Sequence, residues 1–420
     1  MKAYTKLIAV GMSVALTAGI VGCGSPSTAK TDASGSETTA KSSGVNSQDE
    51  THKIGVAVYN LTDDEVQMFR SYYEDYLADA FDVEFVYSET ITSIDDEKEF
   101  VDQAKATGCE GIISYVSYDL PEITDYCADD LYYVIASGTF TEEDYEAASQ
   151  HSHFLGITGP SADDEYNAGQ NLIESIANED SDVSATQKSW VLLNGGTESG
   201  NYMHEQRFLG ALDKLQELGY TLEASEDELK SATENCLAAT HPDGGTVYLC
   251  PGYYYSADSQ VNFTKAMEET DPDAVVSVCS LAIMYDTLED KEVSQNKNIQ
   301  IGAVDSFTET NNEAFEKEDS FGNSSIDCII GKCSAMGAPA FIAMYNAVTG
   351  HEDVVKDNNQ AYHLSQNMWI ASSPEEYEEM YAKASNIYKN VYSTEEMMNV
   401  LGAYNSDASY EDYEAFVDEL

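Results

Sequence analysis

The sequence predicts an α/β protein made of two lobes, each a doubly wound parallel sheet with helices on its faces. Strand-like apolar runs alternate with amphipathic stretches of helix length from residue 53 onward, and this alternation is typical of βαβ units with parallel strands. The chain beyond residue 52 also exceeds the size that a single hydrophobic core usually serves. We therefore expect two lobes.

The spacing of apolar residues places each element. Residues 54–59 form an apolar run of strand length, and the helix expected over 63–80 has Val66, Phe69 and Tyr73 on one face. Further strands are expected over 83–87, 110–115, 132–136, 154–157, 190–193, 220–224, 246–249, 274–278 and 299–304. Further helices are expected over 95–107, 121–129, 162–176, 202–218, 257–270 and 336–348. Right-handed crossovers bring the loops at the carboxyl ends of the strands together, where open sheets bind ligands.

The first residues have the pattern of an exported lipoprotein. Lys2 and Lys6 flank the start of an apolar, uncharged run over 7–21, as in a secretory signal peptide covering 1–22. The run is too short and too often interrupted by glycine for a membrane-spanning helix. The sequence Ile-Val-Gly-Cys ending at Cys23 resembles the bacterial lipobox, which implies that Cys23 carries acyl chains such as palmitate and anchors the protein to a membrane. An ordinary secretory signal with an incidental Cys23 is the alternative.

Residues 23–52 are expected to form a flexible tether. They consist mainly of Ser, Thr, Ala, Gly, Lys and acidic residues. Such a segment has almost no apolar surface to bury, so it cannot offset the entropy lost on folding.

The charge of the chain excludes one large class of partner. Twenty basic residues stand against 76 acidic ones, for a net charge of −56. No basic stripe could meet the phosphates of a nucleic acid, and the folded body is not expected to dock on anionic lipid. We interpret the charge as a solvated surface, because no Asp-x-Asp-x-Asp-Gly calcium loop occurs.

Motifs for catalysis and for metal binding are missing. The sequence contains no Gly-x-Ser-x-Gly elbow, no His-Glu-x-x-His and no Gly-Lys-Ser/Thr phosphate loop. His151 and His153 lack a third ligand nearby, which favours solvated histidines over a metal site. We expect no catalytic residue, no cofactor and no metal.

Seven cysteines remain besides Cys23, so they cannot all pair within one chain, and no Cys-x-x-Cys occurs. Several lie in apolar runs, where a free cysteine behaves as a small hydrophobic residue. A disulfide Cys109–Cys127 or Cys236–Cys250 is left open.

Five segments, in order, resemble type I periplasmic binding proteins, the family that includes ribose- and galactose-binding proteins. They are residues 53–59, the run Ala-Thr-Gly-Cys-Glu-Gly-Ile-Ile over 106–113, the strand–Gly–helix segment from 193 to 210 with its Arg-x-x-Gly, the strand over 298–305 that ends in Asp305, and the helix over 336–350. The likeness covers about 53–368.

The resemblance implies two interleaved lobes joined by three crossings that form a hinge. Lobe one would comprise 53–157 plus 336–350, and lobe two 158–330 plus 364–370. Residues 373–420 lie outside the resemblance and form an acidic, tyrosine-rich extension expected to pack on the body.

The resemblance also implies a ligand site between the lobes. Asp63, Arg207 and Asp305 stand where the family has polar ligand contacts, and Tyr115 and Tyr202 are candidates to supply aromatic faces. Arg207 could instead form a surface salt bridge, Asp305 could cap a turn, and either tyrosine could be a rim or packing residue. Three family positions are not kept: Ala136-Ser137-Gly138-Thr139 replaces an Asp, Val278-Cys279-Ser280 replaces Asn-Asp, and Gly331 or Lys332 replaces a Gln.

The function implied is that of the substrate-binding lipoprotein of an ABC importer, outside the cytoplasm and held at the membrane by Cys23. It would act as a monomer, bind a small polar solute, either sugar-like or nucleoside-like, and deliver it to a permease. A sensory receptor of the same fold that signals through a membrane kinase or chemoreceptor is the alternative.

Overall fold

The computed structural model describes residues 51–179, 183–253, 256–385 and 390–419. The signal peptide, most of the tether and Cys23 lie outside these residues. Both lobes belong to one compact unit, Ser47–Leu420.

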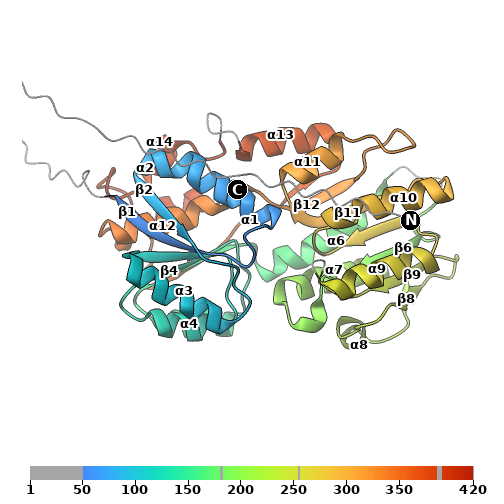
Figure 1. The fold of residues 1–420 in the computed structure, drawn as a ribbon, viewed down its shortest axis with the longest axis horizontal. Helices are drawn as coiled ribbons and strands as arrows, with labels where there is room; N and C mark the ends of the chain where they lie inside the picture. Colours follow the sequence, from blue (N-terminus) through green and yellow to red (C-terminus); the bar gives the residue numbers. More distant parts are fainter. Residues whose placement is uncertain (1–50, 180–182, 254–255, 386–389, 420) are drawn as a thin grey trace, which may run out of the picture. The chain divides into compact units, whose positions relative to one another are not determined.

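Lobe one is built on a six-stranded sheet in the order β13-β5-β4-β3-β1-β2, in which all neighbours are parallel. Its strands are β1 (His52–Ala57), β2 (Val83–Tyr87), β3 (Gly111–Ser114), β4 (Tyr132–Ala136), β5 (Phe154–Gly159) and β13 (Tyr362–Ser365). Its helices are α1 (Asp64–Ser71), α2 (Ala78–Phe81), α3 (Ile94–Thr107), α4 (Leu120–Cys127), α5 (Glu142–Ala148) and α12 (Ala338–Val348). Figure 1 shows α3 and α4 on one side of this sheet and α2 and α12 on the other.

Neighbouring residues along each strand of this sheet pack against helices on opposite faces. Val56, Ile113 and Val134 pack in the same cluster as Phe341 of α12. Residues next to them in the chain, such as Ile112 and Ile135, pack with α3 and α4 instead. Successive side chains of a strand point to opposite faces of the sheet. When helices cover both faces, every residue of the strand is buried, and the strand's sequence is a continuous apolar run.

Lobe two is built on an eight-stranded sheet in the order β14-β12-β11-β10-β6-β9-β8-β7. Its strands are β6 (Ser189–Leu193), β7 (Thr221–Leu222), β8 (Cys236–Thr240), β9 (Thr246–Cys250), β10 (Ala274–Ser277), β11 (Gln300–Ser306), β12 (Cys328–Lys332) and β14 (Trp369–Ala371). Its helices are α6 (Ala162–Asn178), α7 (Tyr202–Glu217), α8 (Glu226–Lys230), α9 (Ala257–Glu269), α10 (Tyr285–Gln295) and α11 (Glu309–Glu316). The five central strands are parallel, whereas β7, β8 and β14 pair antiparallel at the two edges.

The chain crosses between the sheets three times within the body: after β5, after β12 and after β13. The segment 364–370, expected as one strand of lobe two, is divided between two strands. Leu364 and Ser365 pair with β5 in the sheet of lobe one, and Trp369 and Ile370 pair with β12 in lobe two.

The residues after 373 form three helices, α13 (Pro374–Ser385), α14 (Thr394–Asn399) and α15 (Tyr410–Val417). They are not a separate body, because Tyr377, Tyr392 and Tyr413 belong to the same hydrophobic cluster as Phe307 of lobe two and Phe341 of lobe one.

The structure corrects the long helix expected over 63–80. It consists of α1, a π-helical segment Tyr72–Leu77 and α2. A 3.6-residue period turns Tyr72 and Tyr76 away from the face that Tyr73 and Leu77 share. The wider π turn buries all four against the core.

Helices α6 and α7 approach each other unusually closely. A Cβ atom at Gly169 would overlap the carbonyl oxygen of Arg207, and one at Gly210 would overlap that of Tyr166. Glycine is therefore required at both points for the two backbones to touch.

We predict that Gly169→Ala lowers the free energy of unfolding by about 1–3 kcal/mol, because the added methyl group forces the two backbones apart. Urea denaturation followed by circular dichroism measures the change. Asn167→Ala on the exposed side of the same helix is the control and should stay within about 0.5 kcal/mol of the parent. Equal stability of the two variants would show that α6 can shift without loss.

Candidate functional site

The carboxyl ends of the strands of both sheets meet, and side chains link them directly. Ser306, the last residue of β11, donates from Oγ to the carboxylate of Glu65 in α1. Lys332 Nζ, at the end of β12, donates to the carbonyl oxygen of Ser137 after β4, at 2.8 Å. Thr139 Oγ1 donates to Glu165 Oε1 at 3.2 Å. We call this region, where three pairs of residues connect lobe one with lobe two, the strand-end interface.

On the side of lobe one, a tyrosine joins two carboxylates. The Tyr59 hydroxyl lies 2.9 Å from Asp63 Oδ1 and 3.2 Å from Glu65 Oε1. Asp63 also caps α1, accepting from the backbone N–H groups of Glu65 and Val66 at 2.9 and 3.4 Å. The structure thus gives the buried Asp63 a structural task at the edge of the interface.

Arg207 is held in a buried ion pair. Its Nε donates to the carboxylate of Glu165, a side chain with 0 % exposure, and its Nη1 donates to the Val278 carbonyl oxygen at 3.1 Å. A surface salt bridge, the alternative from the sequence, is therefore wrong, because Arg207 itself is only 4 % exposed. The close contact of α6 and α7 brings the two side chains together.

Asp305 lies at the end of β11 and accepts from Asn311 Nδ2 at 3.0 Å. Burial raises the pKa of its carboxyl group from 3.8 to about 7, and the negative charges of Asp63 and Glu65 add to the rise, while hydrogen bonds from Asn311 and Ser280 oppose it. The N-cap of the following helix α11 is Thr308 and not Asp305.

The two predicted tyrosines do not join this group. Tyr115 stacks on Phe69 with ring centroids 4.5 Å apart and donates to the Tyr73 hydroxyl at 2.9 Å, so it packs within lobe one. Tyr202 is the partly exposed first residue of α7. As ligand contacts, all five candidate residues stay predictions, and Asp63, Arg207 and Asp305 are the ones that lie at or beside the interface.

Lys332 was noted in the sequence only as a departure from the family pattern, yet it is central. Its side chain is 3 % exposed, and its Nζ contacts Met203 Sδ at 3.6 Å in addition to the Ser137 carbonyl oxygen. Ser137 has a φ of 57°, an uncommon conformation for a residue with a Cβ, and its buried hydroxyl has no hydrogen-bond partner among the described residues. The sequence signal that could have identified Lys332 is its place at the end of a short buried strand.

His204 adds a neutral acceptor beside Arg207. Its Nδ1 lies 2.7 Å from the carbonyl oxygen of Gly195, which assigns the ring proton to Nδ1. Burial, together with the positive charges of Arg207 and Lys332, lowers the pKa of the imidazole to about 3, although the hydrogen bond to Gly195 opposes this shift. At neutral pH the ring is uncharged, and Nε2 can accept a hydrogen bond.

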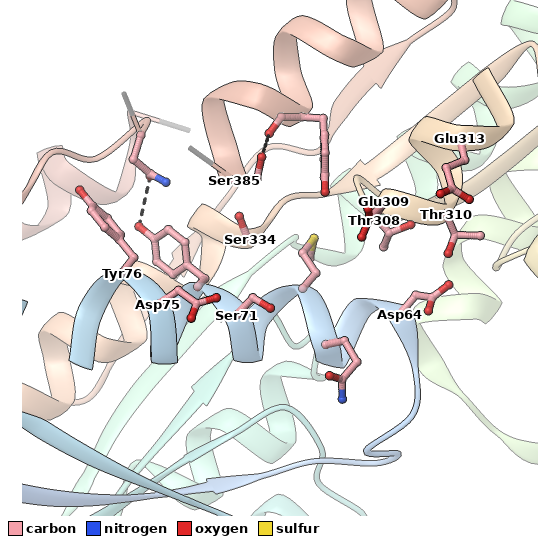
Figure 2. Close-up of a pocket in the computed structure, with 15 residues that line it drawn as sticks. Asp64, Ser71, Asp75, Tyr76, Thr308, Glu309, Thr310, Glu313, Ser334 and Ser385 are labelled. Carbon is pink, nitrogen blue, oxygen red and sulfur yellow. Dashed lines mark hydrogen bonds between the residues drawn. The ribbon is translucent and has the colours of Figure 1, made fainter. Parts of the chain in front are cut away.

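A separate cavity lies next to the crossing after β12, and we call it the hinge-side cavity (Figure 2). Its volume is about 340 Å³, and its lining includes the carboxylates of Asp64, Asp75, Glu309 and Glu313. Figure 2 shows Asp64 of α1 facing the first turn of α11, and Ser334 between Ser71 of α1 and Ser385. It is adjacent to the strand-end interface, but its walls hold none of the five predicted ligand residues.

Three further features concern metals, disulfides and membranes. Within residues 51–419, gaps aside, no three His, Cys, Asp or Glu side chains are arranged to hold a metal ion. Cys109, Cys127, Cys236 and Cys250 are free thiols, so the two disulfides left open by the sequence are not formed. None of the described helices combines the length and apolar character needed to cross a bilayer.

Comparison with known proteins gives a match in structure only. No protein-family model matches the chain, and the search of curated proteins finds no match. An ABC transporter solute-binding protein from Bacillus halodurans C-125 with bound myo-inositol shares 16 % identity and a TM-score of 0.56, covering 79 % of this chain and 98 % of its own. The periplasmic component of an arabinose ABC transporter from Shewanella sp. ANA-3, bound to L-arabinofuranose, has 15 % identity and a TM-score of 0.55. The match covers 79 % of this chain and 95 % of the transporter component. A periplasmic solute-binding protein from Actinobacillus succinogenes 130z with bound D-allose has 12 % identity and a TM-score of 0.55. The match covers 78 % of this chain and 99 % of that protein.

At these identities the likeness establishes a shared fold. The prediction of two α/β lobes with parallel sheets is confirmed, and they match type I periplasmic binding proteins.

We predict that Asp305→Asn makes the protein's stability less dependent on pH. The pKa of Asp305 is about 7 in the folded state and 3.8 in the unfolded chain. Between pH 3.8 and pH 7 the folded state therefore binds this proton more tightly than the unfolded chain does. The free energy of unfolding of the parent falls as the pH rises through this range. The melting temperature of Asp305→Asn relative to the parent should therefore increase from pH 4.5 to pH 8. Thermal melts across this range, with Asp290→Asn on the exposed side of α10 as control, test this, and a difference that stays constant with pH would contradict it.

Proposed function

We propose that this protein is an extracytoplasmic, lipid-anchored substrate-binding protein of an ABC importer that takes a small polar solute, sugar-like or nucleoside-like, at the strand-end interface. One observation carries the proposal. Polar side chains of both lobes meet at the carboxyl ends of parallel strands, the place where open α/β sheets bind ligands.

The groups available there suit a solute rich in hydroxyl groups. Asp305 and Glu65 offer carboxylate acceptors, Lys332 and Arg207 offer charged donors, and Nε2 of His204 offers a neutral acceptor. A hydroxyl group both donates and accepts, so a polyol can satisfy all three kinds of group at once. The myo-inositol, arabinofuranose and allose bound to the structural neighbours belong to this class.

The motion that admits the solute is a change in the angle between the lobes. The links between the lobes at the interface are hydrogen bonds between side chains or from a side chain to a carbonyl oxygen, and a bound polyol can replace each of them. The three crossings provide the hinge. Binding is the whole reaction in this proposal, and no catalytic step is assigned.

The lipid anchor rests on the sequence around Cys23. An acyl chain there holds the body at the membrane, next to the permease that would receive the solute.

We predict that a screen of sugars, polyols and nucleosides by thermal shift identifies a solute that raises the melting temperature, because a ligand of the native state stabilises it. Titration calorimetry at pH 8, above the Asp305 pKa of about 7, should then show that Asp305→Ala weakens binding about tenfold or more, since a hydrogen bond to a charged group contributes about 1.5–3 kcal/mol. The control Asp290→Ala, in the same lobe but exposed, should keep the parent affinity. Parent affinity in Asp305→Ala would remove this residue from the site, and a screen in which no solute shifts the melting temperature would contradict the binding role.

We predict that Cys23→Ser releases the protein from the membrane fraction or leaves the leader uncleaved, because the acylated thiol is lost. Cell fractionation and the mass of the product measure both results. Cys236→Ser, a partly exposed cysteine of the body, is the control and should remain in the membrane fraction. Membrane retention of a mature-sized Cys23→Ser product would refute the anchor.

A further inference from the structure

The C-terminal extension is attached to lobe two through α13. The buried Tyr377 stacks on Phe307 with ring centroids 4.7 Å apart and packs against Phe315 at 4.8 Å. Its hydroxyl donates to the Thr308 carbonyl oxygen at 2.9 Å. Burial of the ring combined with a satisfied hydroxyl makes this a firm attachment.

The later part of the extension is attached to lobe one. The Tyr76 hydroxyl donates to the Tyr392 carbonyl oxygen at 2.7 Å, and the Tyr413 hydroxyl donates to that of Pro339 at 3.1 Å. Asn346 of α12 donates to the Val400 carbonyl oxygen at 2.9 Å and accepts from the Gly402 N–H at 2.8 Å.

These two attachments are joined to each other beside the hinge. The Ala384 carbonyl oxygen accepts from Ser334 Oγ, in the crossing after β12, at 2.8 Å and from Asn390 Nδ2 at 2.7 Å. The Val391 N–H donates to the Lys383 carbonyl oxygen at 3.0 Å. The end of α13 is thus bonded to the residues that lead onto lobe one and to the hinge itself.

We propose that α13 together with residues 390–417 is a strap, a fourth connection that restricts how far the two lobes separate. Because its two ends are bonded to different lobes and to each other, a rotation that parts the strand ends must break bonds at one end or at the junction with Ser334. The strap therefore favours the arrangement in which the strand ends meet. This inference concerns the motion of the lobes and does not require the proposed solute.

The test removes hydrogen bonds of the strap without removing its buried rings. The variant Ser334→Ala/Asn390→Ala/Tyr76→Phe deletes bonds at the junction and at the lobe-one attachment. A matched control, Ser385→Ala/Asn405→Ala/Tyr126→Phe, has the same three types of substitution and deletes bonds that stay within the strap or within lobe one.

Spin labels attached through Glu99→Cys on α3 and Glu268→Cys on α9, both exposed positions, report the distance between the lobes in the full chain without solute. A labelled chain lacking these two substitutions gives the background from native thiols. Pulsed electron resonance should show a larger population of molecules with a long distance between the two labels in the strap variant. We expect this population to increase about fivefold for each hydrogen bond lost. The matched control should keep the parent distribution.

A folded strap variant with the parent distribution would overturn the proposal. Circular dichroism and thermal melts establish folding first. If the triple variant does not fold, Asn390→Ala alone, a partly buried residue at the junction, takes its place with the same two outcomes. A failed solute screen would leave this result unaffected, because the distance is measured without ligand.

Discussion

The strand-end interface depends on the cost of taking charged groups out of water. A buried charge is tolerated only when an opposite charge or several hydrogen bonds compensate it. Arg207 and Glu165 compensate each other, and they can do so because Gly169 and Gly210 let α6 and α7 touch. A Cβ atom at either glycine would overlap the backbone of the facing helix and force the two helices apart.

The same constraint links the lobes. Lys332 belongs to lobe two, but the carbonyl oxygen that accepts from its ammonium group belongs to Ser137 of lobe one. Glu65 of lobe one likewise accepts from Ser306 of lobe two. Each lobe thus carries polar groups whose hydrogen-bond partners belong to the other lobe. Under the proposed function, a polar solute between the lobes replaces these partners.

The tyrosine-rich extension shows how an acidic chain connects its parts with few cations. Only 20 Lys and Arg residues are present for 76 acidic ones, so ion pairs cannot serve at many contacts. Tyr377 and Tyr413 of the extension, and Tyr76 of lobe one where it meets the extension, instead bury their rings and donate their hydroxyl groups to backbone carbonyl oxygens. This combination supplies apolar area and a directed bond without adding charge.

The fold class follows from the sequence because the periods of strands and helices are local properties of the chain. The run over 54–59 and the alternation after it predicted parallel sheets, the length of the chain predicted two lobes, and α6 and α7 begin where predicted. The π-helical turn at Tyr72–Leu77, the antiparallel edge strands and the division of 364–370 between two sheets were not predictable in this way. They depend on which distant surface each segment meets.

For the site, the sequence by itself determined that polar residues such as Asp63, Arg207 and Asp305 stand near the ends of strands or in the first turns of helices. Only the tertiary structure decided what each one does there. It made Asp63 a helix cap, gave Arg207 the buried partner Glu165, and brought Lys332 to Ser137. The physical reason is that the ionisation and bonding of a buried group are set by neighbours in space. Lys332 and Ser137 are 195 positions apart in the chain, and no local pattern records that they meet.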